Sequence, residues 1–119
     1  MRLVHRSDSD DSADHVLATD LEFAETFGAR TRGLMFRRSI PDDYGLVFRF
    51  DSAKKRDLHM LFVPFSIDAI WTVEGRVTSV KRLGSWTGLG RARADTIVEL
   101  PAGAADGVQP GDFVTVVDR

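Results

Sequence analysis

Cysteine is absent from this chain of 119 residues, and histidine is scarce. Without cysteine the chain can form no disulfide bond, no thiol nucleophile and no thiolate metal site. The three histidines are His5, His15 and His59, and a histidine metal centre would require all of them to converge. The composition therefore predicts no metal and implies no other cofactor.

Long hydrophobic runs and a strong net charge are also missing. No stretch approaches the ~20 apolar residues that a membrane-spanning helix needs, and the first residues lack the apolar centre of a signal peptide. The formal net charge of -2 gives no bias toward nucleic acid or acidic membranes. We expect a soluble cytoplasmic protein with no nucleic-acid or membrane partner, and the sequence leaves the oligomeric state open.

The composition that remains is that of one globular domain, with 43% hydrophobic and 29% charged residues. Residues 1–14 form a poorly patterned N-terminal segment, because the stretch from Ser7 to Asp14 contains only serine, aspartate and one alanine. Such a stretch buries nothing and predicts a solvated acidic loop. Residues 15–119 are expected to form a single β-rich domain.

Alternation of apolar and polar residues predicts several short strands, at residues 2–5, 15–24, 45–50, 58–62, 67–73, 76–83, 96–100 and 113–117. Residues 51–56 read as a polar turn, residues 74–75 as a tight hairpin turn and residues 84–95 as a glycine-containing loop. Apolar residues at helical spacing after Thr26 predict one short helix over residues 27–36. The pattern is typical of a mainly β barrel or sandwich with one short helix across it.

Several short motifs resemble a known family in their order and spacing. They are Ala24, Thr26, the run Arg-Gly-Leu-Met-Phe-Arg at residues 32–37, residues 45–50, Met60, Asp68, the run Glu-Leu-Pro-Ala-Gly at residues 99–103, Gly107 and Gly111-Asp112. Over about residues 24–117 the chain resembles the uncharacterised family known as domain of unknown function 192. The resemblance implies a jelly-roll-like, mostly β domain without an established activity. The chain departs from the commoner family pattern around Met60, where Leu61-Phe62 replaces a Lys-Asn pair, so no role of that pair is inherited.

Asp68 is the leading candidate for a functional carboxylate, because it lies inside an apolar run. A buried carboxylate without a partner costs several kcal/mol, on the order of 3 to 5. The sequence therefore favours a structural Asp68 that pairs with an arginine or accepts hydrogen bonds from the bend at residues 64–66. In the functional alternative, Asp68 accepts hydrogen bonds from a ligand or acts as a general base, with Glu99 as the second carboxylate.

A second group of candidates consists of His59, Arg32, Arg37 and Trp86. Arginine presents a planar fork suited to carboxylate and phosphate, so Arg32 and Arg37 near the predicted helix could bind an anion beside the Trp86 loop. Each of these residues also has an ordinary explanation as a solvated surface side chain.

Three functions remain open on the sequence alone. The first is a small binding or accessory module with a cleft for a polar or anionic ligand, such as a saccharide or a phosphorylated metabolite. The second is a hydrolase or isomerase that uses Asp68 and Glu99 as acid and base. The third is an interaction or assembly protein that exposes the apolar segment from Leu61 to Phe65.

Overall fold

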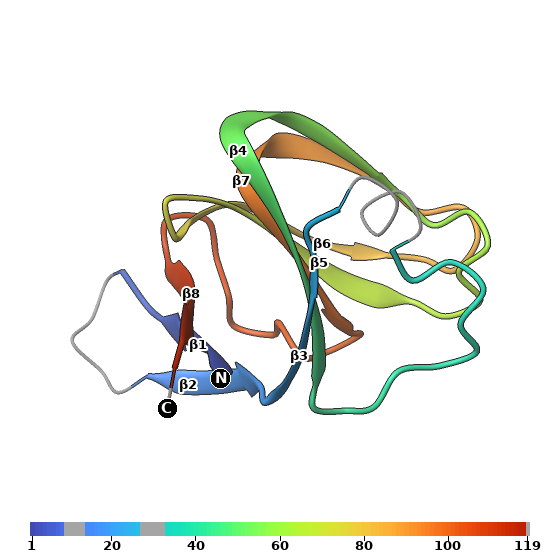
Figure 1. The fold of residues 1–119 in the computed structure, drawn as a ribbon, viewed down its shortest axis with the longest axis horizontal. Helices are drawn as coiled ribbons and strands as arrows, with labels where there is room; N and C mark the ends of the chain where they lie inside the picture. The colour runs from blue at the N-terminus through green and yellow to red at the C-terminus, as the bar shows by residue number, and fades with distance from the viewer. Residues whose placement is uncertain (9–13, 27–32, 119) are drawn as a thin grey trace.

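Eight strands form one open, mixed sheet in the computed structural model, which describes residues 1–8, 14–26 and 33–118 (Figure 1). The strands are β1 (Arg2–Arg6), β2 (His15–Ala18), β3 (Asp20–Ala24), β4 (Tyr44–His59), β5 (Ile67–Val73), β6 (Arg76–Leu83), β7 (Leu89–Pro101) and β8 (Phe113–Val117). Their order across the sheet is β2-β1-β8-β6-β5-β7-β4-β3. The β3–β4 pair is parallel and the other neighbours are antiparallel.

The two edge strands, β2 and β3, are consecutive in the chain and are separated by Thr19 alone. The backbone amides of Thr19 and Asp20 both donate to the carbonyl oxygen of Asp43, at 3.0 Å each. The sheet therefore curls until its edges approach this corner, although it does not close. The prediction of a mainly β domain is confirmed, and a closed barrel is not formed.

The predicted helix over residues 27–36 is wrong for the part that the structure describes, and residues 27–32 lie outside the described residues. Residues 33–36 form turns. Gly33 and Phe36 both have left-handed backbone angles, with φ of 51° and 69°, and a right-handed helix cannot contain them. The amide of Phe36 donates instead to the carbonyl oxygen of Phe62, at 2.8 Å. The helical spacing of the apolar residues was therefore misleading.

Strands β4 and β7 are much longer than predicted, because two segments expected to be irregular pair with each other. The end of the polar turn at 51–56 and the second half of the loop at 84–95 form one ribbon, in a register that runs from Lys54 opposite Ala94 to His59 opposite Leu89. A register shift between Arg49 and Lys54 separates this ribbon from the rest of the β4–β7 pair. The hairpin turn at 74–75 is confirmed, since Glu74 and Gly75 both have positive φ and join β5 to β6.

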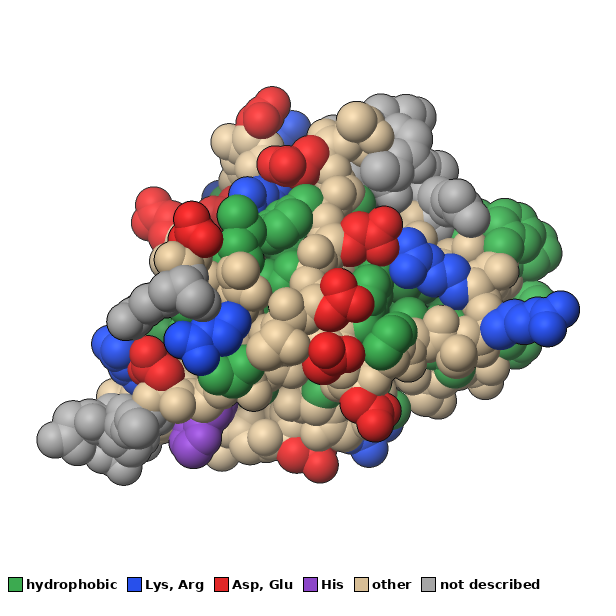
Figure 2. Space-filling view, turned by 60° about the horizontal axis from the view of Figure 1, so that its bottom comes forward, with side chains coloured by type: hydrophobic (Ala, Val, Ile, Leu, Met, Phe, Trp, Pro, Cys, Tyr) green, Lys and Arg blue, Asp and Glu red, His purple; other side chains and the backbone are tan. Residues whose placement is uncertain are grey.

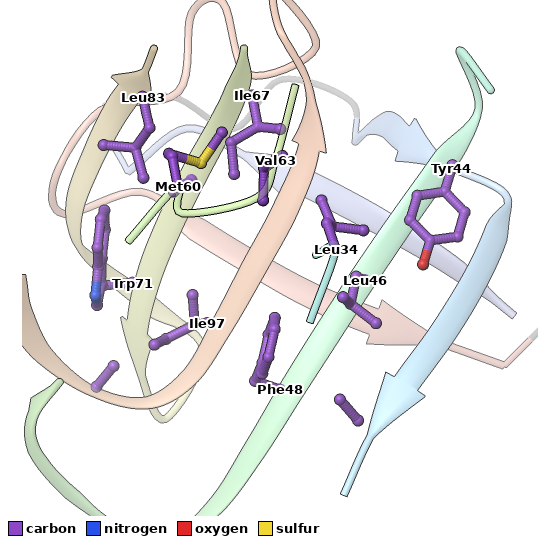
Figure 3. Close-up of a cluster of buried hydrophobic side chains, with 13 residues drawn as sticks. Leu34, Tyr44, Leu46, Phe48, Met60, Val63, Ile67, Trp71, Leu83 and Ile97 are labelled. Carbon is purple, nitrogen blue, oxygen red and sulfur yellow. The ribbon is translucent and has the colours of Figure 1, made fainter. Parts of the chain in front are cut away.

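Two hydrophobic clusters lie on opposite faces of the sheet. Along β5 and β7, the first cluster contains Ala69, Trp71 and Ile97, and the second contains Ile70, Val98 and Leu100. Because successive side chains of a strand point to opposite faces, this alternation assigns residues 67–72 of β5 and 96–101 of β7 to one side or the other. Figure 3 shows the first cluster, in which Leu34 and Val63 from loops pack toward Phe48 and Leu46 of β4.

Asp112 ties the beginning of the chain to its end. Its carboxylate accepts hydrogen bonds from the amides of Asp8 and Gln109, at 3.1 and 3.0 Å, and lies 2.8 Å from Nε2 of the buried His5. Burial raises the pKa of Asp112, but the contacts with His5 and the two amides outweigh it and hold the pKa below its usual value. The motif Gly111-Asp112 is therefore explained by a structural contact between β1 and the turn before β8.

Candidate functional site

Three loops meet at one end of the sheet and are joined by backbone hydrogen bonds. They are the turns at residues 33–37, residues 60–63 after β4 and residues 84–88 before β7. The Phe36 amide donates to Phe62, the Met60 amide to Gly88 and the Trp86 amide to Val63, over 2.8 to 3.0 Å. Because each loop is bonded to another, their backbones are tied to one another at this end of the sheet.

Each loop presents one exposed aromatic side chain, and we call Phe36, Phe62 and Trp86 the aromatic platform. Their exposed fractions are 66%, 40% and 52%. The rings of Phe36 and Phe62 are stacked with centroids 5.0 Å apart, and Trp86 meets Phe62 edge-on at 6.1 Å. In Figure 2, hydrophobic side chains lie exposed at the right-hand end of the molecule, where Figure 1 places these loops.

The backbone of the platform is strained as well as exposed. Among the described residues, four that are not glycine have positive φ, and three of them are Phe36, Phe62 and Trp86, with φ of 69°, 62° and 66°. The fourth, Glu74, is explained by its hairpin turn. A left-handed residue other than glycine costs roughly 1–3 kcal/mol, and such strain is concentrated at functional sites. Three of the strained backbone positions in the described residues therefore coincide with three large exposed rings.

A cavity of about 160 Å³ lies behind these loops, in the first hydrophobic cluster. Its wall combines Glu99 from β7 with Gly33, Leu34 and Met35. The two runs that carry the family resemblance, Gly-Leu-Met at 33–35 and the glutamate of Glu-Leu-Pro-Ala-Gly, thus meet at one place. The sequence did not reveal this contact, because it depends on residues more than sixty positions apart.

Glu99 is a buried carboxyl group without a full set of partners. The residue is 3% exposed, and its Oε1 has no hydrogen-bond partner within residues 1–8, 14–26 and 33–118. Burial raises its pKa to about 8, and the positive charge of Arg37 offsets only part of that shift. The carboxyl group is therefore largely protonated at neutral pH, unlike an exposed glutamate.

Asp68 lies on the other face of the sheet and has a structural environment. It shares that face with Ile70 and Leu100, whereas Glu99 lies opposite Ala69 and shares the face of Ile97. Arg82 binds both carboxylate oxygens of Asp68, with Nε at 2.8 Å, and the amides of Gly103 and Ala105 donate at 2.9 and 3.0 Å. The arginine partner agrees with the prediction, but the amides come from the turn after β7 rather than from residues 64–66.

The remaining predicted residues are distributed around the platform end. His59 is exposed at the end of β4, and its Nδ1 accepts a hydrogen bond from the Leu61 amide at 3.2 Å. Arg37 binds Glu22 and the Tyr44 hydroxyl, at 2.8 and 3.0 Å, on the β3–β4 edge. Arg32 lies outside the described residues. The structure therefore brings His59 and Trp86 to one end, with Arg37 nearby, and separates Asp68 from them.

Two further classes of site find no support in the described part of the chain. Residues 1–8, 14–26 and 33–118 contain no group of three or more His, Asp or Glu side chains placed to hold a metal ion. The same residues include no helix with the length and hydropathy needed to cross a bilayer.

The fold and the site define a small, all-β protein whose loops at one end expose a cluster of aromatic rings. The chain belongs to the DUF192 family, described as Uncharacterized ACR, whose sequence profile matches residues 9–116. No curated protein matches the chain.

Two solved structures share the fold. One is a protein from Sinorhizobium meliloti 1021 described as a putative transcription regulator, with a TM-score of 0.78 and 22% identity, covering 96% of this chain and 91% of that protein. The other is a protein of unknown function from Novosphingobium aromaticivorans DSM 12444, also with a TM-score of 0.78 and 22% identity, covering 98% and 84%. At this level of identity the similarity shows the fold alone.

Proposed function

We propose that this protein is a small binding module that holds a saccharide against the aromatic platform. The observation that carries the proposal is the exposure of Phe36, Phe62 and Trp86 on loops that are strained and bonded to one another. Strain and exposed apolar area both reduce stability, so their coincidence at three residues supports a role in binding.

The chemistry of the platform favours a saccharide over the other ligands considered. The C–H groups of a sugar ring carry partial positive charge and pack on the negative face of an aromatic ring, while its hydroxyls remain in water. A phosphorylated ligand would need cations, yet the nearby Arg37 is engaged by Glu22 and Tyr44. A neutral or amino saccharide suits the platform better than an anion.

The size of the exposed apolar surface also argues for a small ligand. Among the described residues, seven large hydrophobic side chains are exposed, and five of them lie at this end: Phe36, Leu61, Phe62, Trp86 and Leu89. Val63 is buried and Phe65 packs partly against the core, so the segment from Leu61 to Phe65 is not a continuous exposed patch.

An acid–base enzyme that uses Asp68 and Glu99 is disfavoured by their positions. Two carboxylates that act on one bond have to face the same pocket, at separations of about 5 to 10 Å. Strand alternation directs these two side chains to opposite faces of the sheet. The carboxylate of Asp68 already accepts hydrogen bonds from Arg82 and from two backbone amides.

Tryptophan fluorescence tests the proposal directly. Trp71 is 1% exposed and Trp86 is 52% exposed, so a ligand on the platform changes mainly the emission of Trp86. The probes are glucose, galactose, mannose, N-acetylglucosamine and the β-1,4-linked trimers of glucose and N-acetylglucosamine. We expect at least one trimer to shift the emission saturably, and to bind more tightly than its monomer because it covers more than one ring.

Matched variants identify the binding surface. Phe62→Ala is expected to weaken the trimer at least tenfold, which corresponds to about 1.4 kcal/mol, while Leu89→Ala, which removes a neighbouring exposed side chain, leaves the affinity unchanged. Absence of binding to every probe would overturn the saccharide proposal. Concentration-dependent dimerisation in sedimentation experiments, abolished by Phe62→Ala, would establish the assembly function in its place.

A further inference from the structure

The cavity beside Glu99 is separate from the exposed rings and has its own chemistry. Its volume is about 160 Å³, and a water molecule occupies roughly 30 Å³ of liquid. The space therefore matches a ligand of about five non-hydrogen atoms. Leu34, Phe48, Leu58 and Val63 supply apolar walls, and the polar groups at its border are Glu99, Asp57 and His59.

Glu99 gives this cavity one unmet hydrogen-bond acceptor. Buried side-chain oxygens are almost always hydrogen-bonded, and no described residue bonds to Oε1 of Glu99, which makes this oxygen available to a ligand. A cation beside Glu99 favours the ionised form of the carboxyl group, and an ionised carboxylate only accepts hydrogen bonds, so a cationic partner would act as the donor. The apolar side chains around the cavity provide none.

Gly33 keeps the space beside that oxygen open. A Cβ atom at residue 33 would lie 3.7 Å from Oε1 of Glu99 and 3.3 Å from Cζ of Phe48. The carboxyl group and the aromatic ring therefore border the same volume, and any side chain at residue 33 would project into it. A positive group placed there would contact a carboxylate and an aromatic ring together, and both attract cations.

We propose that the cavity binds the ammonium group of a small alkyl amine, with Glu99 as its counter-ion and the alkyl chain against the apolar walls. The ammonium group donates to Oε1 and lies near Phe48. Asp57 adds negative charge at the border, although Arg91 pairs with it. The charge of Arg37 opposes the amine, and its hydrogen bonds to Glu22 and Tyr44 direct the guanidinium toward the β3–β4 edge.

Butylammonium and n-butanol are the probes that test this proposal, because they have nearly the same size and differ in charge. The experiment is run at pH 9, where Glu99, with a pKa of about 8, is ionised and an alkyl amine, with a pKa of about 10.4, is still protonated. Amide chemical shifts in NMR titrations report binding. We expect butylammonium to shift the amides of residues 33–35 and 99 and to bind at least tenfold more tightly than n-butanol.

Two variants separate charge from shape. Glu99→Gln keeps the size of the side chain and removes its charge, so the preference for butylammonium over n-butanol should disappear. Glu74→Gln removes a charge from an exposed turn and should leave the preference unchanged. Equal affinity for the two probes, unchanged amine binding in Glu99→Gln, or no binding of either probe would each overturn the proposal.

The amine site and the aromatic platform can be tested separately. Trp86→Ala should weaken the oligosaccharide and leave butylammonium binding intact, because Trp86 does not line the cavity. Loss of both ligands in a Trp86→Ala protein that retains its folded amide spectrum would contradict the assignment of two sites.

Discussion

Replacement of Glu99 by glutamine should stabilise the protein, and by an amount that depends on pH. The folded protein holds the pKa of Glu99 at about 8, against 4.5 for an ordinary glutamate. Between these two values the unfolded chain loses the proton and the folded protein keeps it. The folded state thus binds more protons, so this group lowers the free energy of unfolding as pH rises.

The magnitude follows from the size of the pKa shift. Each pKa unit corresponds to about 1.4 kcal/mol, so the cost is absent below pH 4.5 and approaches on the order of 5 kcal/mol above pH 8. That is a large part of the 5–15 kcal/mol by which domains are stable. Glutamine does not titrate, so Glu99→Gln should escape this cost.

Urea unfolding at pH 5, 6, 7 and 8 measures the difference. The free energy of unfolding of Glu99→Gln minus that of the native sequence should grow by roughly 1 kcal/mol for each pH unit. Glu74→Gln, which alters an exposed glutamate, should run parallel to the native sequence. A difference that stays constant from pH 5 to pH 8 would refute the buried, uncompensated state of Glu99.

Three other substitutions test the scaffold that supports the site. Asp68→Ala should lower the free energy of unfolding by about 2–4 kcal/mol in urea titrations, because it leaves the amides of Gly103 and Ala105 without their hydrogen-bond acceptor. Unchanged stability would contradict the structural role of Asp68. Gly90→Ala should lower the melting temperature by several degrees, since the new Cβ would lie 2.5 Å from Trp71, and a neutral result in calorimetry would show that the ring can move. Asp112→Asn should destabilise the protein at neutral pH, because the lowered pKa of Asp112 stabilises the fold while the carboxylate is ionised. This effect should begin to shrink as the pH falls below 3.8 and disappear only below the lowered pKa of the folded protein. Acid titrations followed by circular dichroism would reveal a pH-independent effect if this is wrong.

The strands bounded by turn residues were predictable from the sequence. The predicted bounds of β5, β6 and β8 coincide with the observed ones, because a segment that contains proline or glycine precedes each of them. The β4–β7 ribbon was not predictable in the same way. Lys54, Lys55 and Arg56 are three charged residues in a row, so they show no alternation of apolar and polar residues. Only their pairing with β7 in the structure shows that they form a strand.

The candidate site was only partly accessible to sequence reasoning. Trp86 and His59 were singled out and do lie at the end that carries the platform. Phe62 was placed in a predicted strand over residues 58–62, because alternation cannot show that β4 ends at His59. Phe36 was placed on a helix, and its left-handed φ has no signature in its residue type. Glu99 falls in the predicted strand at residues 96–100, and its burial away from polar partners depends on contacts that are distant in sequence. The ligand, the cytoplasmic location and the absence of nucleic-acid partners stay predictions.

The pairing of β1 with β8 has a practical consequence for work with this protein. Arg2 lies opposite Val117, so the two chain ends are neighbours, and Figure 1 places them at the left, away from the loops of the platform on the right. An affinity tag, a fluorophore or an immobilisation anchor at either end would therefore leave the rings accessible. A short linker between the ends would also give a circular permutant whose new termini could be opened elsewhere, for example at the Glu74–Gly75 hairpin.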